Sequence, residues 1–348
     1  MAKRTKTDDS AFQALKDALK SGELGRCYLF YGEEDYLRTA YLERLRGKLL
    51  SGPAEEFNYH RFSPETLDWN AVADAVEAMP MMAERTVVEL DDVDLYKEPE
   101  ANREKLVSIL GDIPDYCCLI FVYDAVPYAP DKRLKKLYAA MEQNVCAVCF
   151  ARQSASELRA WIRRHAMADG KDIDAAACDY LSFLTGGSMT AMNSELMKLT
   201  AYASGKAITK QDIDAVVEPT LDAVTFDISN ALVDGDFERA LRKLRDLFKM
   251  QEEPVLILGA IAGQMRRLRC AKVLMENGKG SDELMKLCSI GDYPARLTMT
   301  AARKLSAPFC DRAVLECLET DRAMKSSGGD PQRLLELLLV RLSQEADR

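Results

Sequence analysis

The chain has 348 residues, with 47 basic and 56 acidic side chains and a formal net charge of −9. Its 48% hydrophobic and 30% charged residues are typical of a folded globular protein and exclude wholesale disorder and fibrous structure. The length predicts about two to three domains, and the acidic balance argues against a protein that coats nucleic acid on its own. No stretch approaches about 20 uncharged apolar residues, and the polar N-terminus does not resemble a secretory signal. We therefore expect a cytoplasmic protein without a membrane span.

The first part of the chain alternates short apolar runs with helical patterns, such as those over residues 36–50 and 69–79. The apolar runs predict five strands: Cys27–Tyr31, Phe57–Phe62, Thr86–Leu90, Cys117–Tyr123 and Val145–Phe150. Because strands that alternate with helices are typical of parallel sheets, we predict an α/β domain with helices on both faces of the sheet.

The segment after the first predicted strand has the position of a phosphate-binding loop but not its residues. Such a loop reads G-x-x-x-x-G-K-[ST] between a strand and a helix. Gly32 and Thr39 occupy the first and last positions, whereas Leu37 replaces the second glycine and Arg38 replaces the lysine. The missing glycine removes the backbone freedom that lets N–H groups surround a phosphate.

Three acidic residues, Glu33 to Asp35, would place negative charge where a triphosphate lies. They are also compatible with an ordinary helix N-terminus, where the helix dipole favours acidic side chains. We predict a degenerate loop that does not bind nucleotide. The alternative is a nucleotide-dependent ATPase with an atypical loop, in which Asp91, Asp92 or Asp124 would be magnesium ligands.

A second candidate site is the segment Met79-Pro-Met-Met82. The preceding helical pattern has an apolar stripe that we expect to face the core, formed by Trp69, Val72, Ala73, Val76 and Met79. Pro80 should lie near the end of this helix, and Met81 and Met82 are out of phase with the stripe. The two methionines either form an exposed apolar contact for a partner or fold back into the core.

The ten cysteines are scattered and include a single Cys-x-x-Cys unit, Cys146 to Cys149. In a strand, residues three apart point to opposite faces, so these two thiols cannot share a metal ion. His60 and His165 have no neighbouring ligand set in the sequence. We predict no metal site and read the cysteines as small core residues in a reducing compartment.

After about residue 152 the strand signals stop. Ser154 and Glu157 form a capping-box pattern, and apolar residues then recur at helical spacing to the C-terminus. We predict three domains: an α/β domain over 1–150, a small helical domain over 151–215 and a larger helical domain over 216–348.

The last predicted helix, 331–342, is apolar nearly all round, which places it at the centre of its domain or in an interface with another subunit. Its candidate interface residues are Leu334, Leu335, Leu338 and Leu342. Two basic clusters, over 132–136 and 266–269, are either phosphate contacts or solvated helix faces.

In order and spacing, several segments together resemble the delta-subunit family of bacterial DNA polymerase III clamp loaders, over essentially the whole chain. The segments are Tyr28–Leu37, Met79–Arg85, Gly186–Leu199, Glu252–Pro254 and Asp321–Gly328. The resemblance implies an AAA+-like fold with a RecA-like α/β domain, a small helical lid and a helical collar.

The same resemblance implies a subunit that neither binds nor hydrolyses ATP and needs no cofactor. Active AAA+ relatives carry an arginine in a lid pattern like G-D-x-R, and Thr190 stands at that position here. The Ser-Arg-Cys finger of other loader subunits is absent from the sequence. With the degenerate loop at Gly32, three parts of the ATP machinery are missing.

The resemblance also implies the partners and the function. Members of the family bind and open the sliding clamp (beta) for loading onto primed DNA, as non-catalytic subunits of a nucleotidyltransferase holoenzyme. Pro80, Met81 and Met82 occupy the clamp-binding position. Further partners are the gamma/tau and delta prime subunits in a hetero-pentamer, joined through a collar that includes the 331–342 leucines, and primed DNA held by the assembled complex.

Overall fold

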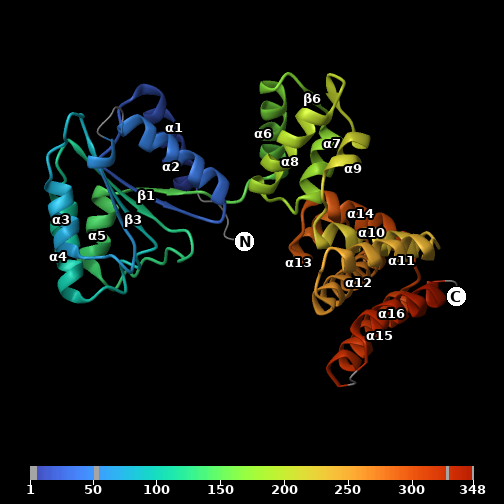
Figure 1. Cartoon of the computed structure of the whole chain (residues 1–348). Coiled ribbons are helices and arrows are strands. Elements are labelled where there is room, and N and C mark those ends of the chain that lie inside the picture. Colours follow the sequence, from blue (N-terminus) through green and yellow to red (C-terminus); the bar gives the residue numbers. More distant parts are fainter. Residues whose placement is uncertain (1–5, 51–54, 327–328, 347–348) are drawn as a thin grey trace. The chain divides into compact units, whose positions relative to one another are not determined.

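The computed structural model describes residues 6–50, 55–326 and 329–346. The chain forms two compact units, one ending at Gln153 and the other beginning at Ser154 (Figure 1). Within the described ranges, no helix is both long enough and apolar enough to cross a membrane. The further division of the second unit near residue 215 stays a prediction.

The first unit is built on a five-stranded parallel sheet in the order β2-β3-β4-β1-β5. Its strands are β1 (Cys27–Tyr31), β2 (Tyr59–Phe62), β3 (Thr86–Asp91), β4 (Cys117–Val122) and β5 (Cys146–Cys149). Its helices are α1 (Lys6–Ser21), α2 (Asp35–Leu49), the 3-10 turn η1 (Glu55–Phe57), α3 (Trp69–Glu77), α4 (Glu100–Gly111) and α5 (Lys135–Asn144). The predicted α/β fold and all five strands are confirmed, with small shifts at the strand ends.

Alternate residues of the central strands supply two separate cores. In β4, Leu119 and Phe121 pack with residues of α3, α4 and α5, whereas Cys118 and Ile120 pack with residues of α1 and α2. Every residue of β4 is buried, as a continuous apolar run in a parallel sheet requires. Helices therefore cover both faces of the sheet.

The second unit is largely helical, as predicted. Its helices are α6 (Ala155–Ala168), α7 (Ala175–Leu184), α8 (Met189–Tyr202), α9 (Lys210–Val216), α10 (Leu221–Val233), α11 (Phe237–Lys249), α12 (Pro254–Glu276), α13 (Ser281–Cys288), α14 (Asp292–Arg303), α15 (Ala307–Ser326) and α16 (Pro331–Ala346). The capping box of Ser154 and Glu157 begins α6. A pair of two-residue parallel strands, β6 (Asp172–Ile173) and β7 (Ala207–Ile208), was not predicted, because two residues are too few to show a strand period.

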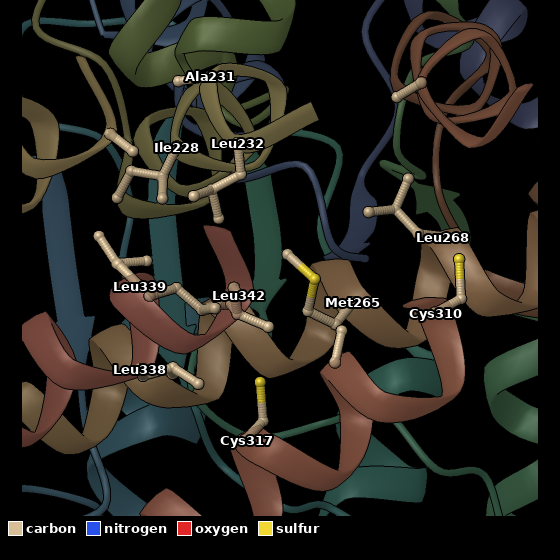
Figure 2. Packing of buried hydrophobic residues seen from close by; sticks show 14 of the residues in the cluster. Ile228, Ala231, Leu232, Met265, Leu268, Cys310, Cys317, Leu338, Leu339 and Leu342 are labelled. Atoms are coloured by element: carbon tan, nitrogen blue, oxygen red, sulfur yellow. The ribbon is translucent and has the colours of Figure 1, made fainter. Parts of the chain in front are cut away.

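The main core of the second unit joins helices α10 to α16. Helix α16 packs against α10, α11, α12 and α15. Figure 2 shows Leu338, Leu339 and Leu342 of α16 in one cluster with Ile228 of α10 and Met265 of α12. This helix is a central part of its own unit.

Candidate functional site

The segment after α3 is an exposed apolar turn. Helix α3 begins at Trp69, where the Asp68 side chain accepts a hydrogen bond from the Asn70 backbone N–H at 2.9 Å. It ends at Glu77, earlier than predicted, because the residue before a proline is disfavoured in the helical conformation. The prediction that Met79 lies in the buried stripe is wrong: its side chain is 81% exposed.

Met81 and Met82 are also exposed, at 53% and 84%. The alternative in which both side chains fold back into the core is therefore excluded by their exposure. Pro80 lies between them and Met79 and is half-buried. Large apolar side chains that gather on one exposed turn mark a surface for a partner.

The backbone of this turn is held by Asn58, which lies just before β2. Its side-chain oxygen accepts a hydrogen bond from the Met81 N–H at 2.7 Å, and its side-chain nitrogen donates to the Met81 carbonyl at 2.8 Å. The Asn58 backbone carbonyl accepts from the Val87 N–H of β3 at 2.8 Å. Asn58 is 1% exposed, so a buried amide ties the exposed turn to the sheet.

Sequence reasoning missed the role of Asn58. The available signal was an asparagine at the start of a predicted strand, Phe57 to Phe62, where an amide is unfavourable in a ladder. That signal does not say which backbone group the amide would bind, because its partner is distant in the sequence.

Met82 has a backbone φ of +52°. This left-handed conformation is rare for residues other than glycine, because the side chain then approaches the following carbonyl. Strain of this kind gathers at functional sites. Here it accompanies an exposed side chain at the tip of the turn.

The degenerate phosphate loop is filled by a side chain of the protein itself. Arg38 is 4% exposed, donates to the Gly32 carbonyl at 2.7 Å and forms an ion pair with Asp124. Leu37 is half-buried and Thr39 is exposed. The arginine that stands where a lysine would contact phosphates is thus engaged by protein groups.

Gly32 is required by its surroundings. Its φ is +122°, and a Cβ added there would lie 2.4 Å from the Phe150 carbonyl oxygen. The same carbonyl accepts a hydrogen bond from the Glu34 N–H at 2.8 Å. This glycine therefore allows a close contact between backbones, and that contact has no need of a phosphate.

Glu34 is buried in this loop. Burial, with a smaller contribution from the neighbouring Asp35 carboxylate, raises the pKa of Glu34 to about 7. A buried carboxyl group in this loop cannot bind a phosphate favourably, because it is either neutral or negatively charged.

The three candidate magnesium ligands are also engaged by protein groups. Asp91 forms an ion pair with Arg61, and Asp124 pairs with Arg38. One carboxylate oxygen of Asp92 accepts hydrogen bonds from the backbone N–H groups of residues 124–126 at 2.8, 2.9 and 3.0 Å. In the part of the chain that the structure describes, no group of three or more His, Cys, Asp or Glu side chains could hold a metal ion.

The basic clusters are partly neutralised by acidic neighbours. Arg133 binds Asp131 through several hydrogen bonds, the shortest from a side chain being 2.8 Å. Arg269 forms an ion pair with Asp311.

Three of the four candidate interface leucines of the last helix lie in the core of their own unit. Leu335, Leu338 and Leu342 are fully buried in the core of their own unit, and Leu334 is half-buried. A side chain that is buried by its own chain offers little surface to a neighbouring subunit, so the burial of these three residues does not support their expected interface role, which stays a prediction. The exposed leucines of α15 and α16 are Leu315, Leu318 and Leu337.

Family models match both ends of the chain. The model described as "DNA polymerase III, delta subunit" matches residues 28–150, and "DNA polymerase III delta subunit, C-terminal domain" matches residues 222–342. The first match contains both the apolar turn and the filled loop.

Relatives are similar over most of their length. The DNA polymerase III subunit delta of Bacillus subtilis is 27% identical over 95% of this chain and 96% of its own. The Escherichia coli subunit of the same name is 23% identical over 73% of this chain and 72% of its own. The solved structure of the Bacillus subtilis DNA clamp loader delta protein superposes with a TM-score of 0.62 and 25% identity, covering 96% of this chain and 99% of that one.

Proposed function

We propose, since this chain belongs to the DNA polymerase III delta subunit family, that it binds the sliding clamp and opens it for loading onto primed DNA. As a delta subunit of the clamp loader, the chain is part of the DNA polymerase III holoenzyme. The observation that carries the proposal is the exposed turn in which a buried amide holds Met81 and presents Met82.

In the proposed complex, Met81 and Met82 enter an apolar pocket of the clamp. Burying a methionine side chain stabilises a complex by about 1.5–3 kcal/mol, whereas association costs about 4–15 kcal/mol in lost freedom of motion. The two methionines are therefore anchors that need further contacts beside them. Pro80 limits the conformations of the turn before binding.

To open the clamp, the turn must be attached to a rigid part of the subunit, so that the clamp moves when that part moves. Helix α3 leads directly into the turn and packs on β3 and β4, so the turn cannot move far without moving the sheet. ATP bound by sister subunits would control whether this surface is available, as a shift between two populations.

The filled loop supports a subunit that does not hydrolyse ATP. The Arg38 guanidinium and the Asp124 carboxylate form an ion pair. The Glu34 carboxyl group is buried in the same loop. A triphosphate would have to break that ion pair and lie beside an acidic group.

The central experiment is binding of the full chain to a purified bacterial sliding clamp. We expect Met81→Ala/Met82→Ala to weaken binding at least about tenfold, the equivalent of about 1.4 kcal/mol. The matched control is Met167→Ala/Met197→Ala, which removes two methionines of 62% and 64% exposure from the other unit. Equal binding by wild type and Met81→Ala/Met82→Ala, or a wild type that does not bind, would refute the assigned contact.

The second experiment is titration with labelled ATP and magnesium. We expect no saturable binding at concentrations up to about 1 mM, a free energy of about −4.1 kcal/mol. Micromolar binding that depends on magnesium would instead favour the nucleotide-dependent ATPase.

We further propose that exposed leucines of the α15–α16 hairpin contact other clamp-loader subunits. Leu315, Leu318 and Leu337 are 56%, 44% and 44% exposed, whereas the inner leucines of the same hairpin stabilise the unit itself. Large exposed apolar side chains on neighbouring helices are typical of an assembly surface.

A further inference from the structure

Phe57 is an exposed aromatic residue that the clamp-binding proposal does not use. It ends the 3-10 turn η1, and 65% of its surface is accessible. A single exposed apolar residue is ordinary in proteins. Phe57 differs because the next residue, Asn58, holds the Met81 backbone through two hydrogen bonds.

We propose that the segment Phe57–Asn58 is the second half of the clamp-binding surface: Phe57 is a further apolar contact to the clamp, and Asn58 is a positioning residue for the Met81–Met82 turn. The inference rests on the proposed function and names residues that deepen it.

The argument for Asn58 is geometric. A side-chain amide carries a donor and an acceptor in one plane, and here both are used on the same residue, Met81. The peptide groups on either side of Met81 are therefore fixed in orientation. Since Asn58 is buried and its own carbonyl binds Val87 of β3, the sheet determines the direction in which the methionines point.

Fixing a turn before binding reduces the conformational entropy that binding would otherwise remove. This turn carries flexible methionine side chains and a left-handed residue, Met82. A restraint on its backbone therefore lowers the entropy cost of binding. Asn58 thus acts on clamp affinity through Met81 and needs no contact with the clamp.

The argument for Phe57 is its place in the chain, directly before the residue whose side chain is bonded to the turn. The apolar residues of the turn come from the end of α3, and Phe57 comes from the chain segment that the turn is bonded to. A phenyl ring has two rotatable side-chain bonds and buries a large area, so it is an effective anchor at an interface. It supplies the rigid aromatic contact that a pair of methionines lacks. The occupant is the same apolar site of the clamp that receives Met81 and Met82.

The test uses the full chain and the purified sliding clamp. We expect Phe57→Ala to raise the Kd about tenfold and Phe57→Leu to restore most of the affinity, because leucine keeps the apolar contact. The matched control is Tyr202→Ala, which removes an aromatic residue of 58% exposure from the other unit and should leave the Kd unchanged. A Phe57→Ala variant that binds like wild type overturns the contact.

Asn58→Ala tests the positioning role with two readouts. We expect the Kd to rise about tenfold, and hydrogen exchange of the Met81 amide to accelerate at least about tenfold. The amides of β3, Thr86–Asp91, should keep their protection, since the Val87 bond uses the Asn58 backbone. Equal loss of protection in β3 would show a general structural role, and an unchanged Met81 amide would show that the bonds do not restrain the turn; either result overturns the proposal.

The two proposals fail in distinguishable ways. If Met81→Ala/Met82→Ala loses clamp binding while the Phe57 and Asn58 variants bind normally, the inference is wrong and the proposed function stands. If the methionine variant binds as well as wild type, the contact assigned to Met81 and Met82 is wrong, and a wild type that does not bind the clamp would contradict the proposed function itself.

Discussion

Met82 combines a strained backbone with a nearly fully exposed side chain. Its φ of +52° costs about 1–2 kcal/mol for a residue with a Cβ, and an exposed side chain recovers little of that by packing. Such a position is explained if the side chain is used in binding, since proteins keep strained residues where function requires them.

Replacing Met82 with glycine therefore tests the stability of the fold and the affinity for the clamp separately. We expect Met82→Gly to change the free energy of unfolding by less than about 1 kcal/mol, because glycine relieves the backbone strain but loses more entropy on folding. Clamp affinity should fall as it does for Met82→Ala. Urea unfolding and clamp binding of the two variants check this; strong destabilisation by glycine would mean that the Met82 side chain supports the fold.

The burial of Glu34 predicts that the stability of the fold depends on pH. Burial raises the pKa of Glu34 from 4.5 to about 7. Between these two values the Glu34 carboxyl group is protonated in the folded state and ionised in the unfolded chain. The stability contributed by the protonated group is fully present below pH 4.5 and is lost as the pH rises through about 7.

Wild type should therefore lose stability between about pH 4.5 and about pH 7, and Glu34→Gln should lose less over that range. The loss tied to Glu34 is at most about 3 kcal/mol, from about 1.4 kcal/mol for each pKa unit. Urea unfolding at both pH values measures it. Parallel curves for the two proteins would show that Glu34 does not titrate in this window.

At the scale of elements, helix α16 has one leucine face that is buried in its own unit and one leucine that is exposed. Leu338 is fully buried and Leu337 is 44% exposed. The periodicity of the sequence could not separate the buried from the exposed leucines, because a helix that is apolar nearly all round has no polar face to mark the solvent side.

We expect Leu338→Ala to lower the free energy of unfolding by about 2–5 kcal/mol, since it leaves a cavity in the core. Leu337→Ala should change it by no more than about 0.5 kcal/mol but weaken assembly with the other clamp-loader subunits. Urea unfolding and co-elution with those subunits separate the two effects. Assembly that is insensitive to Leu337→Ala would place the contact elsewhere.

At the scale of the whole molecule, the two units have separate hydrophobic cores. The candidate clamp-binding residues all lie in the first unit, which ends at Gln153. A unit with its own core can in principle fold alone.

We therefore expect a chain cut after Gln153 to give a folded first unit that binds the clamp within about threefold of the whole chain's affinity. The second unit alone should fold but not bind the clamp. Circular dichroism, thermal unfolding and clamp binding of each fragment provide the measurement. A folded first fragment that fails to bind would show that the second unit contributes to the clamp contact.

The sequence by itself determined the architecture. Five apolar runs and their alternation with helices predict the parallel sheet, because a strand buried on both faces must be continuously apolar. The altered loop from Gly32 to Thr39 was also visible, since its chemistry depends on residue types at fixed positions.

The tertiary structure alone decided how those residues are used. Burial of Leu338 and exposure of Met79 depend on which elements pack beside them, which local periodicity does not contain. The two bonds from Asn58 to Met81 join segments that are distant in the chain. Such contacts arise only when the sheet brings β2 and β3 together, and they determine where the turn points.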